Sequence, residues 1–280
     1  MGRSDGKLVK DIPAIDRIIP HIMNRRCDAT NFAKAEFDME NLQILLRRLR
    51  LEGHKIGVMD ATITAFALLL QKTPELNRFI VNKKIYQRNH ICVSFVVLKR
   101  EEDGQMNETV VKVFIEQGDS LISISQKIRE AIKENEKPQT KNGLDKLVDK
   151  LASFPLIPGF AVGTLKWMDR RGILPKSVIR LSPFHTSMFV SNLASIQMNY
   201  VYHHTYEFGT TGLFVTLGMP RRLPGEDKTR RVITLGITMD ERICKGAVWV
   251  KALYEFRRIM ENPERLLGEV QETKEAIGAK

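Results

Sequence analysis

The sequence predicts one compact α/β (α+β) domain, because segments with helical periodicity and β-branched segments follow one another with no linker dividing the middle. Its 280 residues are 43% hydrophobic and 28% charged, which is enough apolar material for the core of one large domain. Eleven prolines and eighteen glycines are too few for a linker-rich or fibrous chain. The fold class therefore rests on helices and antiparallel strands sharing a single core.

The first part of the chain is predicted to form an arm and two helices. Residues 1–20 are mixed and polar, and we expect them to pack as an N-terminal arm. In Phe37–Leu51 leucines recur on one face, and Asp38 or Asn41 is placed to cap the helix. Met59–Gln71 is nearly all apolar and ends at a threonine–proline pair, so we expect a helix buried on most sides.

The strand predictions rest on β-branched residues and period-two alternation. In chain order the expected strands are Arg78–Val81, Lys83–Tyr86, Ile91–Leu98, Val110–Ile115, Thr186–Asn192, Phe214–Met219 and Val232–Thr238. The later amphipathic helices are expected over Ser120–Glu134, Leu144–Leu151 and Gly246–Ile259. Residues 269–280 are polar and are expected to fray, so the domain proper is predicted to span residues 21–268.

The charge balance narrows the classes of partner. Lysine and arginine exceed aspartate and glutamate by 44 to 33, a net charge of +11. Such a surface favours a polyanion, an anionic lipid or a phosphate-rich cofactor. The basic residues are scattered pairs, without a basic arm, an aromatic–glycine RNA motif or a zinc finger. Nucleic-acid binding is therefore the less favoured interpretation, and a solvated basic surface the simplest one.

The sequence lacks the features of membrane-spanning, secreted, disulfide-rich and metal-binding proteins. No apolar stretch approaches the ~18 residues of a membrane span, and the N-terminus resembles no secretory signal. The three cysteines are scattered and odd in number, and they have no metal-ligand spacing, so we expect neither a disulfide framework nor a metal site. Reduced thiols and no membrane span predict a cytoplasmic protein.

Five segments, taken in order, resemble the catalytic domain of the 2-oxo acid dehydrogenase acyltransferases (the dihydrolipoamide acyltransferase core) and their chloramphenicol acetyltransferase relatives. These segments are Phe37–Leu42, Thr73–Asn77, Phe189–Leu193, Ile237–Ala247 and Asn262–Leu267. The resemblance implies a chloramphenicol acetyltransferase-like two-layer sandwich, with a mixed sheet flanked by helices, assembled as a homotrimer. No lipoyl-bearing segment precedes the domain, so the resemblance implies a stand-alone version without lipoyl attachment.

The resemblance also implies a reaction. In that family coenzyme A enters a channel between subunits from one side, and an acyl carrier or other acceptor enters from the opposite side. A histidine takes the proton of the attacking thiol or hydroxyl, and a serine or threonine hydroxyl stabilises the oxyanion. Ser191 matches the oxyanion donor and Gly246 the glycine of the last motif. Glu241 stands at the histidine position and Lys245 at the aspartate position.

The glutamate changes the acid–base chemistry. An ordinary glutamate carboxyl is about four pKa units less basic than a thiolate, roughly 6 kcal/mol of uphill proton transfer. An apolar channel would reduce that penalty for Glu241, and a nearby Lys245 cation would restore it. His203 and His204, on the connection after the Ser191 strand, are candidate replacement bases, with packing as their other interpretation. His185 precedes that strand and is either a further candidate or a core histidine.

The remaining residues of the motifs have simpler interpretations. Arg242 and Asp240 are expected to support the loop or a subunit contact. Cys244 is expected to be a buried, inert thiol rather than an activated one. Asn192 and Thr186 are candidates for local hydrogen bonds.

The sequence therefore predicts an acyltransferase that uses acyl-CoA and an unidentified thiol, hydroxyl or amine acceptor. The alternative is a catalytically inactive trimeric scaffold or ligand-binding protein, in which Glu241 and Lys245 form an interfacial ion pair.

Overall fold

The computed structural model describes residues 3–100, 106–135, 157–222 and 230–268, together with residues 143, 146, 149 and 153. Within these residues the main sheet has the strand order β2-β10-β8-β7-β5-β6, and β9 pairs with β10. Its strands are β2 (Thr30–Asp38), β5 (Ile91–Arg100), β6 (Met106–Ile115), β7 (Met188–Asn192), β8 (Leu213–Leu217), β9 (Arg221–Arg222) and β10 (Arg231–Asp240). β7 runs parallel to both β5 and β8, and the other pairs are antiparallel, so the sheet is mixed as expected.

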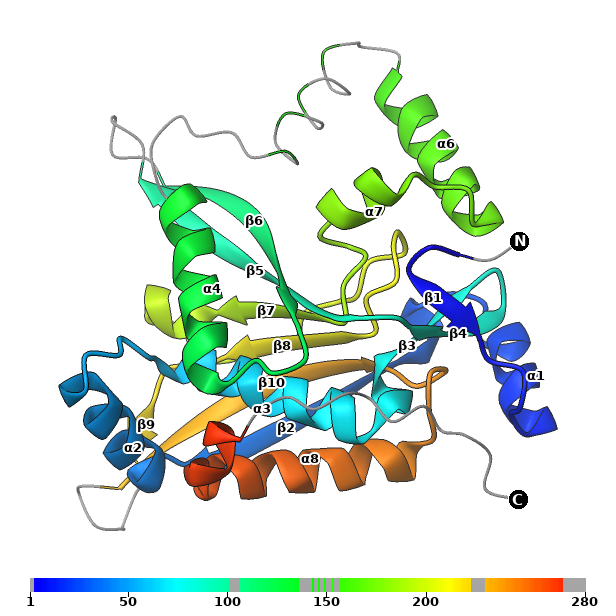
Figure 1. Cartoon of the computed structure of the whole chain (residues 1–280). Helices are drawn as coiled ribbons and strands as arrows, with labels where there is room; N and C mark the ends of the chain where they lie inside the picture. The colour runs from blue at the N-terminus through cyan, green and yellow to red at the C-terminus, as the bar shows by residue number, and fades with distance from the viewer. Residues whose placement is uncertain are drawn as a thin grey trace.

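Helices cover one face of this sheet (Figure 1). They are α2 (Glu40–Leu51), α3 (Val58–Lys72), α4 (Leu121–Asn135) and α8 (Gly246–Glu261). The nearly all-apolar α3 is buried on most sides, as its sequence predicts, and Phe66 stacks on Phe256 of α8 at 4.5 Å between ring centroids. The alternate residues of the strands that face these helices complete the core.

The opposite face of the sheet is covered by the segment between η3 (Leu193–Ile196) and β8. Aromatic rings make this contact: Tyr202 lies against Phe32 of β2 at 5.4 Å between centroids. His203 stacks on Phe214 of β8 at 4.0 Å, and Phe214 stacks on Phe189 of β7 at 4.7 Å. This segment therefore forms the second layer over the central strands.

A small antiparallel sheet, β1-β4-β3, stands at one end of the molecule beside α1 (Figure 1). Its strands are β1 (Gly6–Leu8), β3 (Arg78–Val81) and β4 (Lys84–Arg88), and η2 (Pro74–Asn77) leads into β3. Asn82 and Lys83 both have positive φ, which suits the two-residue turn of the predicted hairpin. The predicted N-terminal arm is thus partly regular, because it supplies β1 and α1 (Ala14–Ile22).

Most predicted elements are found with small shifts of their ends, and one boundary was wrong. Phe37 and Asp38 belong to β2, and α2 begins at Glu40, whose N–H donates to the Asp38 carboxylate at 2.8 Å. The sequence analysis missed β2 because it is an edge strand in which only Ala35 and Phe37 are buried, so the alternation is weak.

The remaining elements are η1 (Cys27–Ala29), α6 (Ile157–Arg171), α7 (Lys176–Leu181) and η4 (Pro263–Leu267), and neither α6 nor α7 was predicted from the sequence. The helix expected over residues 144–151 and the tail 269–280 fall mainly outside the described residues.

Candidate functional site

Glu241 lies directly beyond β10, and residues at the N-terminal start of β2 hold both its backbone and its side chain. Its N–H donates to the carbonyl of Ala29 at 2.9 Å. Its Oε2 accepts a short hydrogen bond from Nδ2 of Asn31. The side chain is half-buried. The carboxylate is therefore fixed at the end of the sheet, with one oxygen bound by a neutral donor.

Asp240 and two arginines make the loop around Glu241 rigid. The buried Asp240 carboxylate accepts from Nε and Nη2 of Arg242 at 2.8 and 2.7 Å. Nε of Arg26 lies 3.6 Å from the same carboxylate. Arg26 also donates to the carbonyls of Tyr206 and Gly209 at 2.6 and 2.9 Å. The loop is thereby tied to the segment that covers the sheet.

Lys245 is the N-cap of α8 and Gly246 its first residue, and in the described part of the chain neither forms a hydrogen bond with the Glu241 side chain. Lys245 is exposed at the N-cap, and within the described part of the chain it forms no ion pair with Glu241. The ion pair expected of a scaffold is thus not found inside one copy. Burial raises the pKa of Cys244 to about 12, so its thiol stays protonated near neutral pH.

Glu241 opens onto a cavity of about 280 Å³ between this loop and the N-terminal arm. Arg78 at the start of β3 lines the same cavity, and its buried Nε has no hydrogen-bond partner in the described structure. The cavity is thus built by parts of the sequence that lie far apart: the arm, the η2–β3 junction with Ile85 of β4, and the loop after β10 with Val248 of α8.

Ser191 lies far from Glu241 in the same chain. It stands opposite Thr216 of β8, which in turn stands opposite Gly236 of β10. With ~4.8 Å between strands and ~3.3 Å per residue, Ser191 and Glu241 are roughly 15–20 Å apart. One copy of the chain therefore cannot bring both side chains to one reacting carbon.

Asn192 and Thr186 have different surroundings from Ser191. Asn192 lines a second cavity of about 450 Å³, with Arg129 of α4 and the first turn of α3 on its other walls. Thr186 is fully buried and donates to the carbonyl of Cys92 at 2.9 Å, so it lies in the core rather than in a site.

His203 lies on the same face of the sheet as Ser191, packed on Phe214. Its Nδ1 is 2.8 Å from the carbonyl oxygen of His204, which can only accept, so Nδ1 carries the proton. In the neutral ring Nε2 is then left with a lone pair. His204 stacks on His203 at 4.6 Å and is exposed. His203 is therefore both a packing residue and a potential proton acceptor.

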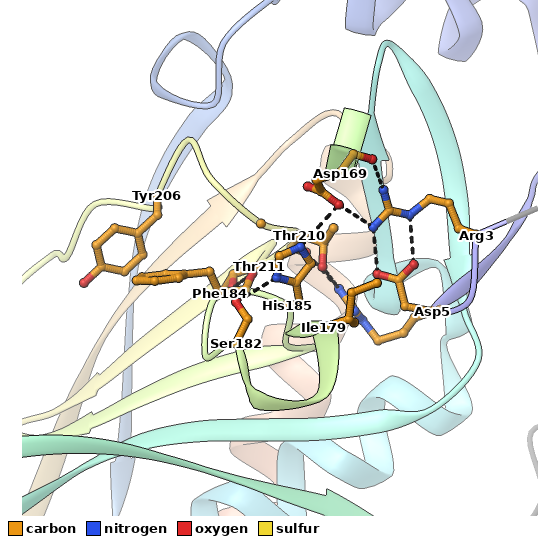
Figure 2. A network of polar contacts seen from close by, with 12 residues as sticks. Arg3, Asp5, Asp169, Ile179, Ser182, Phe184, His185, Tyr206, Thr210 and Thr211 are labelled. Carbon is orange, nitrogen blue, oxygen red and sulfur yellow. Dashed lines mark hydrogen bonds and ion pairs between the residues drawn. The ribbon is translucent and has the colours of Figure 1, made fainter. Parts of the chain in front are cut away.

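His185 belongs to a buried network instead of a channel (Figure 2). Its Nδ1 is 2.8 Å from the hydroxyl of Ser182, and its Nε2 lies 3.3 Å from Asp169 without the alignment of a good hydrogen bond. Arg3 joins Asp169 and Asp5, at 2.8 Å to each carboxylate. Of the two interpretations of His185, its enclosed position supports the core histidine.

Burial lowers the pKa of His185, although contact with Asp169 opposes that shift. Burial alone would raise the pKa of Asp169, but its contacts with His185 and Arg3 hold it below its ordinary value. Because His185 is completely enclosed, we take the ring as neutral, with Arg3 as the cation that balances Asp169.

Sequence reasoning missed Asn31, Arg78 and Arg26. Asn31 was not identified as a site residue because strand β2 was not predicted. Only the tertiary structure places β2 beside Glu241. Arg78 directly follows Thr73–Asn77, one of the segments that carry the resemblance. It is a charged residue at the first position of a predicted strand, and this was the one feature of the sequence that could have marked it as a candidate site residue.

Comparison with solved structures identifies the architecture. The chain aligns over 98% of its length with 99% of a probable dihydrolipoamide acetyltransferase from Listeria monocytogenes 4b F2365, at 15% identity and a TM-score of 0.57. It aligns over 91% with 99% of a chloramphenicol acetyltransferase, at 10% identity and a TM-score of 0.55. The chain has the chloramphenicol acetyltransferase-like fold.

A third similar structure is a truncated catalytic core of the 2-oxoacid dehydrogenase multienzyme complex from Thermoplasma acidophilum. The alignment covers 92% of this chain and 99% of that one, at 16% identity and a TM-score of 0.53. No family model and no curated protein matches the sequence. The comparison thus confirms the predicted fold. Because Glu241 and Lys245 replace the histidine and aspartate of the motif, the chemistry has to be inferred from the site itself.

Two further features bear on the type of site. No helix in the described ranges is both long enough and apolar enough to cross a membrane. Among the same residues, no three histidine, cysteine, aspartate or glutamate side chains are grouped to hold a metal ion.

Proposed function

We propose that this protein is an acyltransferase that moves an acyl group between coenzyme A and a thiol, hydroxyl or amine acceptor. Glu241 accepts the proton of the attacking group, and Ser191 donates to the oxyanion of the tetrahedral intermediate. The observation that carries the proposal is the position of Glu241, a half-buried carboxylate beside a cavity on a loop held by Asp240 and Arg242. The fold, shared with acetyltransferases, supports it.

The reaction needs little movement of the protein. The acceptor attacks the thioester carbonyl carbon, the new bond forms, and the carbon–sulfur bond breaks to release coenzyme A. The rigid loop keeps the Glu241 carboxylate where a proton must be received, and preorganisation of this kind lowers the barrier. One Oε atom binds Asn31, which leaves the other free for the acceptor.

The separation of Ser191 and Glu241 supports an active site shared between copies of the chain. If both act on one acyl group, Ser191 must come from a neighbouring copy, because strand geometry keeps them roughly 15–20 Å apart within one chain. A closed ring of copies satisfies this requirement at every site, and we propose a homotrimer. The exposed side chains of Phe32 and Tyr202 are candidates for the contact.

The cavity of about 450 Å³ is the site we propose for coenzyme A. Asn192 and Ser195, directly after Ser191, form one wall, and apolar side chains from α4 and β8 form the floor. The Arg129 guanidinium offers a cation for a phosphate at the rim, although it also lies 3.9 Å from the Asp60 carboxylate. The net positive charge of the chain would favour approach of this anionic cofactor.

His203 is the alternative base. It lies on the same face of the sheet as Ser191, with its Nε2 available. A scaffold without catalysis is the second candidate function, and the hydrogen bond from Asn31 favours it, because this contact gives the Glu241 carboxylate a structural role as an acceptor.

Release of free thiol from acetyl-CoA, measured with a panel of thiol, hydroxyl and amine acceptors, tests the proposal. Glu241→Gln should reduce the rate about 100-fold or more, and Glu241→His should retain or raise it. His203→Gln separates the two bases, because it should leave the rate nearly unchanged if Glu241 is the base. A scaffold would show no release above buffer with any acceptor.

A complementation experiment tests the shared site. Ser191→Ala and Glu241→Gln proteins, each nearly inactive, are mixed, dissociated and reassembled. Some sites then combine an intact Glu241 from one copy with an intact Ser191 from the next, so activity should return. Reassembled trimers without recovered activity would contradict a site shared in this way.

A further inference from the structure

The cavity beside Glu241 carries charges of both signs that do not pair with each other. Asp16 and Glu75 contribute carboxylates, and Arg78 and Lys245 contribute cations. Among the residues that the structure describes, none of these four side chains forms a hydrogen bond or an ion pair. Arg242, which also lines the cavity, is different because Asp240 neutralises it.

Arg78 is the most unusual of these groups. Its Nε is buried, yet it has no hydrogen-bond partner in the described structure. A buried donor without a partner is uncommon in folded proteins and calls for an acceptor. A guanidinium presents a planar fork of donors that matches a carboxylate with two parallel hydrogen bonds. The missing acceptor is therefore best supplied by a carboxylate.

The cavity lining also carries negative charge. The carboxylates of Glu241, Glu75, Asp16 and Asp11 favour an ammonium group in the cavity and disfavour a second anion beside them. Apolar side chains, including Ile12, form part of the remaining wall. At about 280 Å³ the cavity is slightly smaller than the ~300–1,000 Å³ typical of drug-sized ligands. The geometry points to a small zwitterion with an apolar substituent.

We infer that this cavity binds an amino acid with an apolar side chain, its carboxylate on Arg78 and its amino group at Glu241. The inference rests on the proposed acyl transfer and names the acceptor. A neutral amine is nucleophilic without becoming an anion, and its proton becomes acidic only as the new bond forms. A carboxylate is a sufficient base at that point, whereas a thiol must be ionised before it attacks.

The proposed step balances as follows. The amine nitrogen forms a bond to the thioester carbonyl carbon, and the carbon–sulfur bond breaks. Before the attack the bound ammonium loses one proton to solvent, which gives the neutral amine. Glu241 accepts the second proton as the new bond forms, and that proton reaches the departing sulfur to give coenzyme A. The products are an N-acyl amino acid and free coenzyme A, with no change of oxidation state.

Binding and turnover are measured separately to test the inference. Each of the twenty amino acids is titrated into the protein without coenzyme A, alongside its methyl ester, which keeps the amine but lacks the carboxylate. At least one apolar amino acid should bind, and its ester should bind about tenfold more weakly. Arg78→Gln should weaken the amino acid about tenfold and remove the difference between acid and ester. Arg47→Gln, an exposed arginine on α2, is the matched control.

Turnover with acetyl-CoA then tests the acceptor role. Arg78→Gln should raise the KM for the amino acid about tenfold and change kcat much less, which loss of folding would not do. If no amino acid binds, or acid and ester bind equally, the inference is overturned even when other acceptors are acetylated. If an amino acid binds through Arg78 but no acceptor is acetylated, the proposed function and the acceptor role both fail.

Discussion

Asn31 donates a hydrogen bond to Oε2 of Glu241, and this contact joins the edge strand β2 to the loop that carries the proposed base. A neutral donor stabilises a carboxylate and leaves its second oxygen available. The amide can only present its nitrogen here, because an ionised carboxylate has no proton to donate. The position of the Glu241 carboxylate should therefore depend on the side chain at position 31.

Asn31→Asp should slow acyl transfer about tenfold. The aspartate cannot donate the hydrogen bond that positions Glu241, and its charge repels the Glu241 carboxylate. Asn31→Ala, which only removes the donor, should slow the reaction by less. Asn41→Asp on α2 is the control and should leave the rate unchanged. Equal rates for all three variants would show that the contact with Asn31 does not position Glu241.

The fold followed from the sequence more readily than the site did. α3 and α8 carry long apolar patterns, and the strands around Ser191 are buried on both faces, so local sequence specified these elements. Strand β2 was missed because an exposed edge shows little alternation. The contact between Asn31 and Glu241 joins residues far apart in the sequence, and no local pattern encodes it.

The polar network around Arg3 was likewise not predictable from local sequence patterns. Arg3 is only 7% exposed although it lies near the start of the chain, and its partners are Asp5, just before β1, and Asp169 in the last turn of α6. Residues 1–20 were expected to pack as a polar arm, but no local pattern indicated that Arg3 would be buried in an ion-pair network. Figure 2 shows how these groups converge with His185.

Arg3→Met should destabilise the protein strongly. The substitution keeps the apolar stem but leaves the buried carboxylates of Asp5 and Asp169 without their main cation. We expect a loss of about 3–5 kcal/mol in the free energy of unfolding, measured by urea denaturation. Lys10→Met, an exposed residue on the same arm, should change it by less than about 0.5 kcal/mol. Equal effects of the two changes would show that the network contributes little.

His185 should make stability depend on pH. Burial lowers its pKa in the folded state, so below its ordinary value near 6.5 the unfolded chain binds more protons. The free energy of unfolding should then fall as pH decreases from about 6.5, by up to ~1.4 kcal/mol per unit, until the folded-state pKa is reached. His185→Gln should flatten this dependence between pH 5 and 7, a window above the titration of Asp5 and Asp169. An unchanged slope would contradict this, because it would mean that His185 binds protons equally well in the folded and unfolded states.

The three cysteines should differ in reactivity. Cys27 is exposed, whereas Cys92 is fully buried and Cys244 is partly buried with its pKa raised to about 12 by burial. At pH 8 a maleimide should label Cys27 in the native protein well before Cys244. Mass spectrometry of the labelled peptides identifies the order. Fast labelling of Cys244 would mean that its thiol is activated, in conflict with its position in the fold.

Thiol release from acetyl-CoA by wild-type and Glu241→Gln proteins of the same oligomeric state tests the central claim most directly. The two side chains have nearly the same shape, and glutamine cannot accept the proton. The account predicts release by the wild type in the presence of an acceptor, and a rate at least about 100-fold lower for Glu241→Gln. Equal rates for the two proteins would contradict it.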